Sequence, residues 1–587
     1  MVRLCLALIL SLASGLLLSE PVFSQADVRP SNGQLIMVGG GLGVSNRSVF
    51  LDLIEAAGGT SNAKFVLLPA ASLSLDAAHH FQKELSEFGI QSNQVEILNV
   101  LHSNADQATR DPVNVEKVDR ATAVYMTGGD QVRLVRALTN SDGTDTPLLV
   151  AMRRLYARGG VIAGTSAGAS AQSTKMLSAS GLPSMFVDEG LDALDFGLTK
   201  DTISRGILVT RGLGFLQNGV IDQHFLQYRG RLARLSRVIL ERKIPFGIGI
   251  DRDSAIRVRS DGKVMVTGGR AIVVLADRAT VQSGPTGCSL SNLNVSLISE
   301  GDCFDPLDLT FTLHSSRKPI AEEDVTFDGG FRITDIGSGY AVANALIGGL
   351  AENTQSNQEG IVLQYHDDTS HGYRYEFIKT PASKSFLSDS LDGSRYSVLH
   401  IQINISPIAN GLFPAHTQHP VDLSDLGEEE KLAATAVAFR GMLTTNQGRE
   451  FRPFESVTRR EFAVACVRCL HLNAPKDEGL HDTNDKNRLS IELRQAMEVG
   501  FIKRVSDGEL RLDEQISIQD LKLGLDKLAA LYSTADSSKF RVDIAGIEES
   551  AGSTISRGRL ARLLVELLFP QGFGGNSKVS SPSRLPN

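Results

Sequence analysis

Short apolar runs alternate with segments of helical periodicity over the first half of the chain. The runs typical of buried strands are residues 35–38, 65–68, 95–100, 123–126 and 161–163. The segments with helical spacing between them are residues 49–57, 76–88 and 148–157. Buried strands that alternate with helices are typical of a parallel sheet covered on both faces. This pattern predicts an α/β fold with a doubly wound, mainly parallel sheet.

The pattern changes after about residue 244 to short strands separated by turns. These strands are expected at residues 247–250, 255–258, 264–266 and 272–275. We expect them to form a β-meander that closes a first domain, residues 27–284. Residues 285–421 are rich in Ser, Gly, Asp and Asn and contain alternating segments such as 309–313 and 396–405, which predict an all-β region.

Helical patterns with short connections begin at about residue 422. They predict an all-α, repeated region over residues 422–571, followed by a Gly-, Ser- and Pro-rich tail, residues 572–587, that we expect to be disordered. The N-terminus has one early charge, Arg3, then an apolar run and small residues at Ser24 and Ala26. This predicts a secretory signal peptide over residues 1–26. The alternative, an uncleaved anchor, is disfavoured because the run is shorter than the ~20 residues that span a bilayer.

Composition and charge narrow the functional classes. Of the 587 residues, 42% are hydrophobic and 21% charged, which excludes a wholly disordered chain. The net charge of −8 argues against a nucleic-acid partner, and the absence of Trp argues against an aromatic-lined sugar cleft. We expect no cofactor and no metal, because the sequence shows no metal-ligand cluster or phosphate loop and Gly39–Gly43 is only a weak dinucleotide fingerprint.

Four cysteines follow the predicted signal peptide. Cys288 and Cys303 are a candidate disulfide in an oxidising compartment, and the sequence leaves this pairing open. Cys466 and Cys469 form a single C-x-x-C within a helical pattern, for which two core residues on one helix face are a better interpretation than a zinc site.

A G-x-S-x-G motif spans Gly164–Gly168, after an apolar strand and before a stretch of small residues. This is the context of a nucleophile elbow, in which a tight turn presents the serine, Ser166, to the substrate. The backbone N–H of Ala167 is a candidate oxyanion donor. A second strand-to-helix turn, Gly128–Gln131, offers Gly129 as another donor. A purely structural turn is the alternative at both places.

A polar cluster follows the apolar run Val220–Ile221. It contains Asp222, Gln223 and His224, and then Arg229, Arg231 and Arg234. His224 is the candidate base for the serine. A structural histidine, and arginines on the wet face of an amphipathic helix, are the alternatives.

Five segments together resemble cyanophycinase, of the peptidase E-like family of serine peptidases. They are residues 126–131, 164–169, 212–216, 220–225 and 247–251, which occur in family order within residues 33–280. The resemblance implies a class I glutamine amidotransferase-like fold, with Ser166 as nucleophile and His224 as general base. It also implies a substrate pocket built from Gln131, Asp222, Gln223, Arg229, Arg231 and Arg234.

The acid that orients the histidine is expected between Ser166 and His224, where the chain carries an insertion. Asp188 and Glu189 are the first candidates, followed by Asp192 and Asp195. In the pocket, Asp222 is a planar acceptor suited to a substrate guanidinium, and an arginine is suited to a substrate carboxylate.

The expected function is therefore a secreted, extracytoplasmic serine-type exopeptidase of the periplasm or cell envelope. The family cleaves cyanophycin, a poly-aspartate carrying arginine on its side-chain carboxyls, into β-Asp-Arg dipeptides. The alternatives are an Asp-specific dipeptidase of the same family and an inactive envelope-binding protein. A homodimer is one option for the assembly.

The C-terminal region carries three related helical patterns. Thr458–Glu461 forms a capping box before the first helix, and later copies begin near Ile516 and Ile555. They resemble S-layer homology repeats, which implies cell-wall polysaccharide as a partner. A helical interaction module without glycan binding is the alternative.

Overall fold

The computed structural model describes most of the chain between residues 33 and 568. The described ranges are residues 33–178, 189–199, 206–228, 230–284, 287–320, 340–366, 369–388, 396–408, 450–470, 499–505, 508–532 and 554–568, with short stretches between 325 and 497. The expected signal peptide, the expected disordered tail, and the site candidates Asp188 and Arg229 lie outside the described residues.

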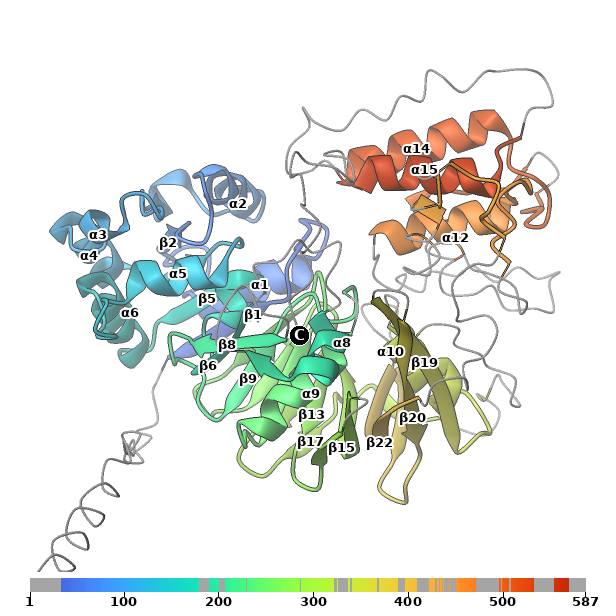
Figure 1. The fold of residues 1–587 in the computed structure, drawn as a ribbon. Helices are drawn as coiled ribbons and strands as arrows, with labels where there is room; N and C mark the ends of the chain where they lie inside the picture. Colours follow the sequence, from blue (N-terminus) through green and yellow to red (C-terminus); the bar gives the residue numbers. More distant parts are fainter. Residues whose placement is uncertain are drawn as a thin grey trace, which may run out of the picture.

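A mixed sheet organises the first half of the chain (Figure 1). In the described residues its order is β17-β16-β12-β11-β1-β5-β4-β2-β3, and β1, β5, β4, β2 and β3 run parallel. Its strands are β1 (Gln34–Val38), β2 (Phe65–Leu68), β3 (Val95–Ile97), β4 (Ala123–Met126), β5 (Val161–Thr165), β11 (Ala255–Val258), β12 (Val264–Thr267), β16 (Cys303–Asp305) and β17 (Thr310–Thr312). The parallel strands coincide with the apolar runs of the sequence, so the expected α/β domain is confirmed.

Helices cover both faces of this sheet because successive strand residues alternate between two cores. Ile36 and Val38 of β1 pack on one face with α1 and α2, whereas Leu35 and Met37 pack on the other with α4, α5 and α6. The helices of this domain are α1 (Arg47–Ala56), α2 (Asp76–Glu87), α3 (Ala105–Ala108), α4 (Pro112–Arg120), α5 (Gln131–Leu138), α6 (Pro147–Ala157), α7 (Ala167–Ser170), α8 (Glu189–Phe196) and α9 (Arg231–Glu241).

A second sheet begins with β9 and continues into the β-rich region. Its main path is β18-β21-β22-β15-β13-β10-β9, in which β9 and β10 are parallel. Its strands are β9 (Gly219–Asp222), β10 (Phe246–Ile250), β13 (Arg270–Leu275), β14 (Thr280–Gly284), β15 (Gly287–Ser299), β18 (Arg317–Pro319), β19 (Asn357–His366), β20 (Thr369–Ile378), β21 (Lys384–Ser388) and β22 (Tyr396–Pro407). A small sheet holds β6 (Lys175–Ser178), β8 (Ile207–Arg211) and β7 (Leu198–Thr199).

The expected β-meander is wrong. The four strands were located correctly, but β11 and β12 extend the first sheet, whereas β10 and β13 pair with each other in the second. The interpretation of residues 285–421 as all-β is also incomplete, because helix α10 (Ala341–Leu346) and a π-helical turn (Ile347–Ala351) lie there. Strand β15 pairs with β13 over six positions, so the β-rich region and the first domain share one sheet.

The C-terminal part has a hydrophobic core of its own around helices α12 (Arg459–Leu470), α14 (Ile518–Tyr532) and α15 (Arg557–Leu568). The expected capping box is present, because the Thr458 N–H donates to Glu461 at 3.0 Å and the Glu461 N–H donates to the Thr458 hydroxyl at 3.2 Å. Buried arginines join the helix starts: Arg459 pairs with Asp520 at 2.7 Å, and Arg557 pairs with Glu461.

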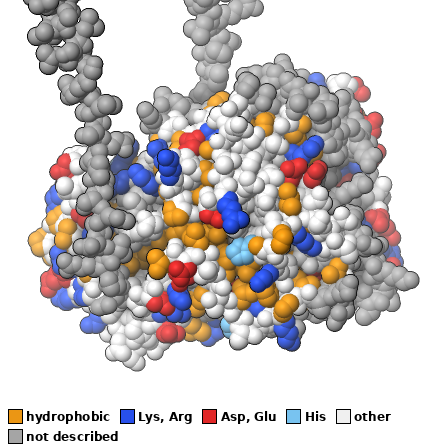
Figure 2. Space-filling view, turned by 90° about the horizontal axis from the view of Figure 1, so that it is seen from below, with side chains coloured by type: hydrophobic (Ala, Val, Ile, Leu, Met, Phe, Trp, Pro, Cys, Tyr) orange, Lys and Arg blue, Asp and Glu red, His pale blue; other side chains and the backbone are white. Residues whose placement is uncertain are grey.

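The cysteines, the lengths of the helices and the surface charges also bear on the predictions. Cys288 and Cys303 are free thiols, and Cys466 is a buried core residue of α12. Within the described residues, none of the helices combines the length and apolarity that a membrane span requires. The face in Figure 2 shows acidic and basic side chains interspersed around a central apolar area.

Candidate active site

Ser166 occupies a strained turn between a strand and a helix. Strand β5 ends at Thr165, Ser166 has φ 53° and ψ −114°, and α7 begins at Ala167. A non-glycine residue with this backbone is rare and is characteristic of functional sites. The flanking glycines are required sterically, since a Cβ on Gly164 would lie 2.4 Å from the Gly168 carbonyl oxygen. The elbow predicted from G-x-S-x-G is therefore confirmed.

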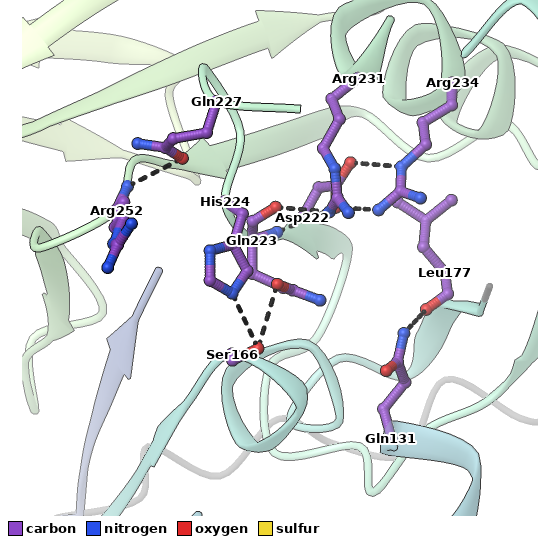
Figure 3. Close-up of polar contacts among 10 residues, drawn as sticks. All are labelled: Gln131, Ser166, Leu177, Asp222, Gln223, His224, Gln227, Arg231, Arg234 and Arg252. Atoms are coloured by element: carbon purple, nitrogen blue, oxygen red, sulfur yellow. Dashed lines mark hydrogen bonds and ion pairs between the residues drawn. The ribbon is translucent and has the colours of Figure 1, made fainter. Parts of the chain in front are cut away.

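His224 lies beside this serine on a second strained turn. It follows the end of β9 with φ 48°, and its N–H donates to the Gly39 carbonyl at 2.8 Å. Its Nε2 lies 3.0 Å from the Ser166 Oγ, and both side chains are partly exposed (Figure 3). This distance is within reach for proton transfer between a nucleophile and its base.

The glycine run after β1 makes room for the histidine. Gly40 has φ 104°, and a Cβ there would lie 2.3 Å from the His224 Nε2. A Cβ on Gly41, at φ 56°, would lie 2.2 Å from the Arg252 Nε. In the sequence these glycines resemble only a weak cofactor fingerprint, and their role beside His224 was not predicted. Because the glycines directly follow the apolar strand β1, the sequence could have placed them at the carboxyl edge of the sheet.

Gln223 also faces the nucleophile. Its Oε1 lies 3.2 Å from the Ser166 Oγ. A hydroxyl has one proton, so Gln223 and His224 compete to accept it. When the proton points toward His224, Gln223 contributes to the lining of the site beside the Ser166 oxygen.

Asp222 is buried and engaged by two arginines of α9. Its carboxylate is 0% exposed and accepts from the Arg231 Nη1 at 2.8 Å and from the Arg234 Nε at 2.7 Å. Burial raises the pKa of Asp222 to about 6, partly offset by Arg231, and lowers the pKa of Arg234 to about 9. At pH 7 the Asp222 carboxyl is therefore mostly ionised, and the Arg234 guanidinium is protonated.

This geometry differs from the expectation that Asp222 meets a substrate guanidinium and that Arg231 or Arg234 meets a substrate carboxylate. The partners of Asp222 come from the protein itself, and both arginines are nearly buried. Arg231 also donates to the Gln223 carbonyl, so the ion cluster holds the backbone immediately before His224. In this structure Asp222, Arg231 and Arg234 form a buried ion cluster that contacts the turn carrying His224.

The two proposed oxyanion residues belong to two turns that meet at Ser166. Ala167 starts α7, and the Gly128–Gly129 turn abuts the serine, since a Cβ on Gly128 would lie 3.4 Å from the Ser166 Cβ. Gln131 begins α5, but its Nε2 donates to the Leu177 carbonyl at 3.0 Å. The oxyanion role of Gly129 and Ala167 stays a prediction.

The candidates for the third acid lie on or beside α8. Glu189 is its first residue, and its side chain lies outside the described residues, like all of Asp188. Asp192 is fully buried, and Asp195 accepts from the Tyr373 hydroxyl at 2.5 Å. The acid that orients His224 stays a prediction.

An α/β domain that presents a serine on a sharp elbow beside a histidine has the geometry of a hydrolase site. Comparison with known proteins agrees with a hydrolase site, because the matching proteins are peptidases. Residues 35–266 match the model of Peptidase family S51. A cyanophycinase of Synechococcus elongatus is 27% identical over 297 residues, which cover 49% of this chain and 83% of that protein. A cyanophycinase of Geminocystis herdmanii is 28% identical over 273 residues, covering 45% and 89%.

A solved structure, a peptidase from an acI-B1 Actinobacterium, is 24% identical and covers 41% of this chain and 90% of that protein, with a TM-score of 0.31. The family match and the curated relatives support a peptidase in the first half of the chain.

Proposed function

We propose that this protein is a secreted serine-type exopeptidase that hydrolyses cyanophycin to β-Asp-Arg dipeptides. The observation that carries the proposal is the contact between the Ser166 Oγ and the His224 Nε2, 3.0 Å apart on two strained turns. The similarity to cyanophycinases supports the choice of substrate.

The arrangement fits a two-step acyl transfer. The Ser166 Oγ attacks the scissile carbonyl while its proton passes to the His224 Nε2, which then protonates the leaving amine. Water deacylates the enzyme with His224 again as base. The N–H groups of Gly129 and Ala167 are the candidate donors to the oxyanion, and Glu189 or Asp188 is the candidate partner that orients the imidazole.

Incubation of the purified full chain with cyanophycin and with Asp-containing dipeptides tests the substrate. Release of β-Asp-Arg from the polymer, abolished in Ser166→Ala, is the expected result. Cleavage of Asp dipeptides alone would favour the Asp-specific dipeptidase. An intact, folded chain that cleaves neither substrate would favour the inactive envelope-binding protein.

We also propose that residues 422–571 are S-layer homology repeats that hold the enzyme at the cell envelope through cell-wall polysaccharide. The contacts that support this link the starts of the three helices: Arg459 of the first reaches Asp520 of the second, and Arg557 of the third reaches Glu461 of the first. Cosedimentation of the full chain with purified cell walls, compared with a chain lacking residues 422–587, tests the attachment. N-terminal sequencing of the exported protein, expected to begin at Asp27, tests secretion.

A further inference from the structure

The turn that carries His224 is held by backbone contacts from the first domain. The His224 N–H donates to the Gly39 carbonyl after β1, and the Phe225 N–H donates to the Ile250 carbonyl at the end of β10, at 3.1 Å. These contacts fix the first half of the turn. The second half, Leu226 and Gln227, contacts a different part of the chain.

Tyr340 of the β-rich region contacts this second half of the turn. Its backbone N–H donates to the Leu226 carbonyl at 2.7 Å, and its hydroxyl accepts from the Gln227 Nε2 at 2.9 Å. Tyr340 lies well beyond residue 266, where the family match ends. The appended region therefore contacts the catalytic turn through both its backbone and a side chain.

The Gln227 side chain, which contacts Tyr340, also contacts two residues of the first domain. Its side chain is 2% exposed, its Nε2 also donates to Asp251, and its Oε1 accepts from the Arg252 N–H at 3.2 Å. Figure 3 shows Gln227 and Arg252 on one side of His224 and the cluster of Asp222, Arg231 and Arg234 on the other. The histidine thus lies between two buried polar networks, one of which includes Tyr340.

Tyr340 is itself held in an unusual conformation. It has φ 62° at the start of α10, a left-handed backbone that is rare for a bulky residue and persists where the surroundings impose it. Its side chain is 6% exposed and packs in the core shared by α9, β15 and α10. Burial and nearby Asp251 raise the pKa of Tyr340, so the phenol stays protonated and available for hydrogen bonding.

We propose that Tyr340 is a positioning residue for His224, which makes the β-rich region a working part of the peptidase site. Tyr340 acts through Gln227, whose amide ties the end of the catalytic turn to Asp251 and Arg252. The inference rests on the proposed function in so far as His224 is the base of Ser166.

The test compares Tyr340→Phe with Tyr396→Phe in the full chain. Tyr396 lies in the same region, and its hydroxyl donates to Glu352. The first measurement is the rate at which a fluorophosphonate phosphonylates Ser166: the Oγ–P bond forms, fluoride leaves, and His224 takes the proton. This reaction needs the Ser–His pair but no knowledge of the natural substrate. The second measurement is kcat and KM on cyanophycin.

Loss of the Tyr340 hydroxyl is expected to lower the labelling rate and kcat about three- to tenfold, as for the loss of one buried hydrogen bond, with KM unchanged. Tyr396→Phe is expected to match the wild type. In Gln227→Met the effect of Tyr340→Phe should shrink, because the group through which it acts is gone. Rates are expressed per folded molecule, determined by circular dichroism.

Equal labelling rates in the wild type and both tyrosine variants would overturn the proposal, as would a full Tyr340→Phe effect in the Gln227→Met background. A wild type that labels at Ser166 but leaves cyanophycin intact would refute the proposed substrate and leave the Tyr340 test in force. A wild type that does not label at Ser166 would refute both the Ser–His pair and the role of Tyr340.

Discussion

The Oγ of Ser166 lies 3.0 Å from the Nε2 of His224, although 58 positions separate the two residues in the chain. Each of them has a positive φ, 53° for Ser166 and 48° for His224. Such backbone conformations cost about 1–3 kcal/mol each and persist where the surrounding structure imposes them. The two residues that the proposed reaction uses are therefore both held in backbone conformations that the surrounding structure imposes.

Replacement of the nucleophile should abolish hydrolysis. Ser166→Ala removes the attacking oxygen, and we expect kcat/KM to fall by about 10⁴- to 10⁶-fold, as in serine peptidases that lose this group. Ser170→Ala, in the same short helix, is the matched control and should retain activity. Hydrolysis by Ser166→Ala at the wild-type rate would eliminate Ser166 as nucleophile.

His224→Asn separates the base from the backbone conformation. Asparagine tolerates a positive φ better than most residues, so this variant should keep the turn while removing the imidazole. We expect kcat to fall by about 10⁴-fold or more. The check is kcat at pH 7 together with thermal unfolding. An active variant with unchanged stability would show that another group is the base.

Asp222→Asn should damage activity on charged and neutral substrates alike. The Asp222 carboxylate is buried against Arg231 and Arg234, so its loss leaves two buried cations without their counter-ion and displaces the turn before His224. Breaking a buried ion pair typically costs about 3–5 kcal/mol of stability. We therefore expect similar losses of kcat/KM on an arginine-bearing polymer and on a citrulline analogue.

Kinetics of both substrates on the same variant check this expectation. A loss confined to the arginine-bearing polymer would restore Asp222 as the group that binds the substrate guanidinium, as its planar carboxylate suggested.

Stability between pH 4 and pH 6 should depend on Asp251. Burial raises its pKa to about 6 from 3.8, partly offset by Arg270. Because the folded protein binds this proton more tightly, the contribution to stability is complete below about pH 4 and is lost as pH rises through about 6. At ~1.4 kcal/mol per pKa unit this amounts to at most about 3 kcal/mol.

Urea unfolding at pH 4 and pH 7 measures this contribution. Asp251→Asn should remove that part of the pH dependence, because its amide does not titrate, whereas Asp261→Asn, at a surface carboxylate, should leave it in place. Equal pH dependence in the wild type and Asp251→Asn would contradict the raised pKa.

The C-terminal helices should depend on Arg557. Its guanidinium is buried, pairs with Glu461 and lies over the Phe451 ring, 5.0 Å from the centroid. Arg557→Met leaves Glu461 without this partner and should destabilise the helical part by about 3 kcal/mol or more. Arg559→Met, at an exposed neighbouring position, should cost less than about 1 kcal/mol. Proteolysis of residues 422–568 measures the difference, and equal protection of both variants would argue against the buried pair.

Local sequence patterns were sufficient for the parallel strands of the first sheet and for the turn at Ser166. Apolar runs such as Phe65–Leu68 became buried parallel strands, because a strand covered on both faces needs apolar side chains on both. The elbow at Ser166 was predictable for a similar reason: glycines at fixed offsets are what a sharp strand-to-helix turn requires. The capping box at Thr458 also depends on neighbours three residues apart.

These local patterns could not predict which strands pair when the strands are far apart in the chain. The strands that were expected as one meander divide between two sheets, since hydrophobic alternation specifies which face is buried but not which strand is the neighbour. Ser166 follows β5 of the first sheet and His224 follows β9 of the second. Their contact therefore depends on how the two sheets meet.

The sequence by itself thus determined the α/β domain and the serine elbow, because each is encoded by residues close together in the chain. The tertiary structure decided what surrounds them. It turned Asp222 toward Arg231 and Arg234, where burial favours protein counter-ions, and it brought Tyr340 from the β-rich region onto the catalytic turn. Those partners are chosen by long-range packing, which local periodicity does not record.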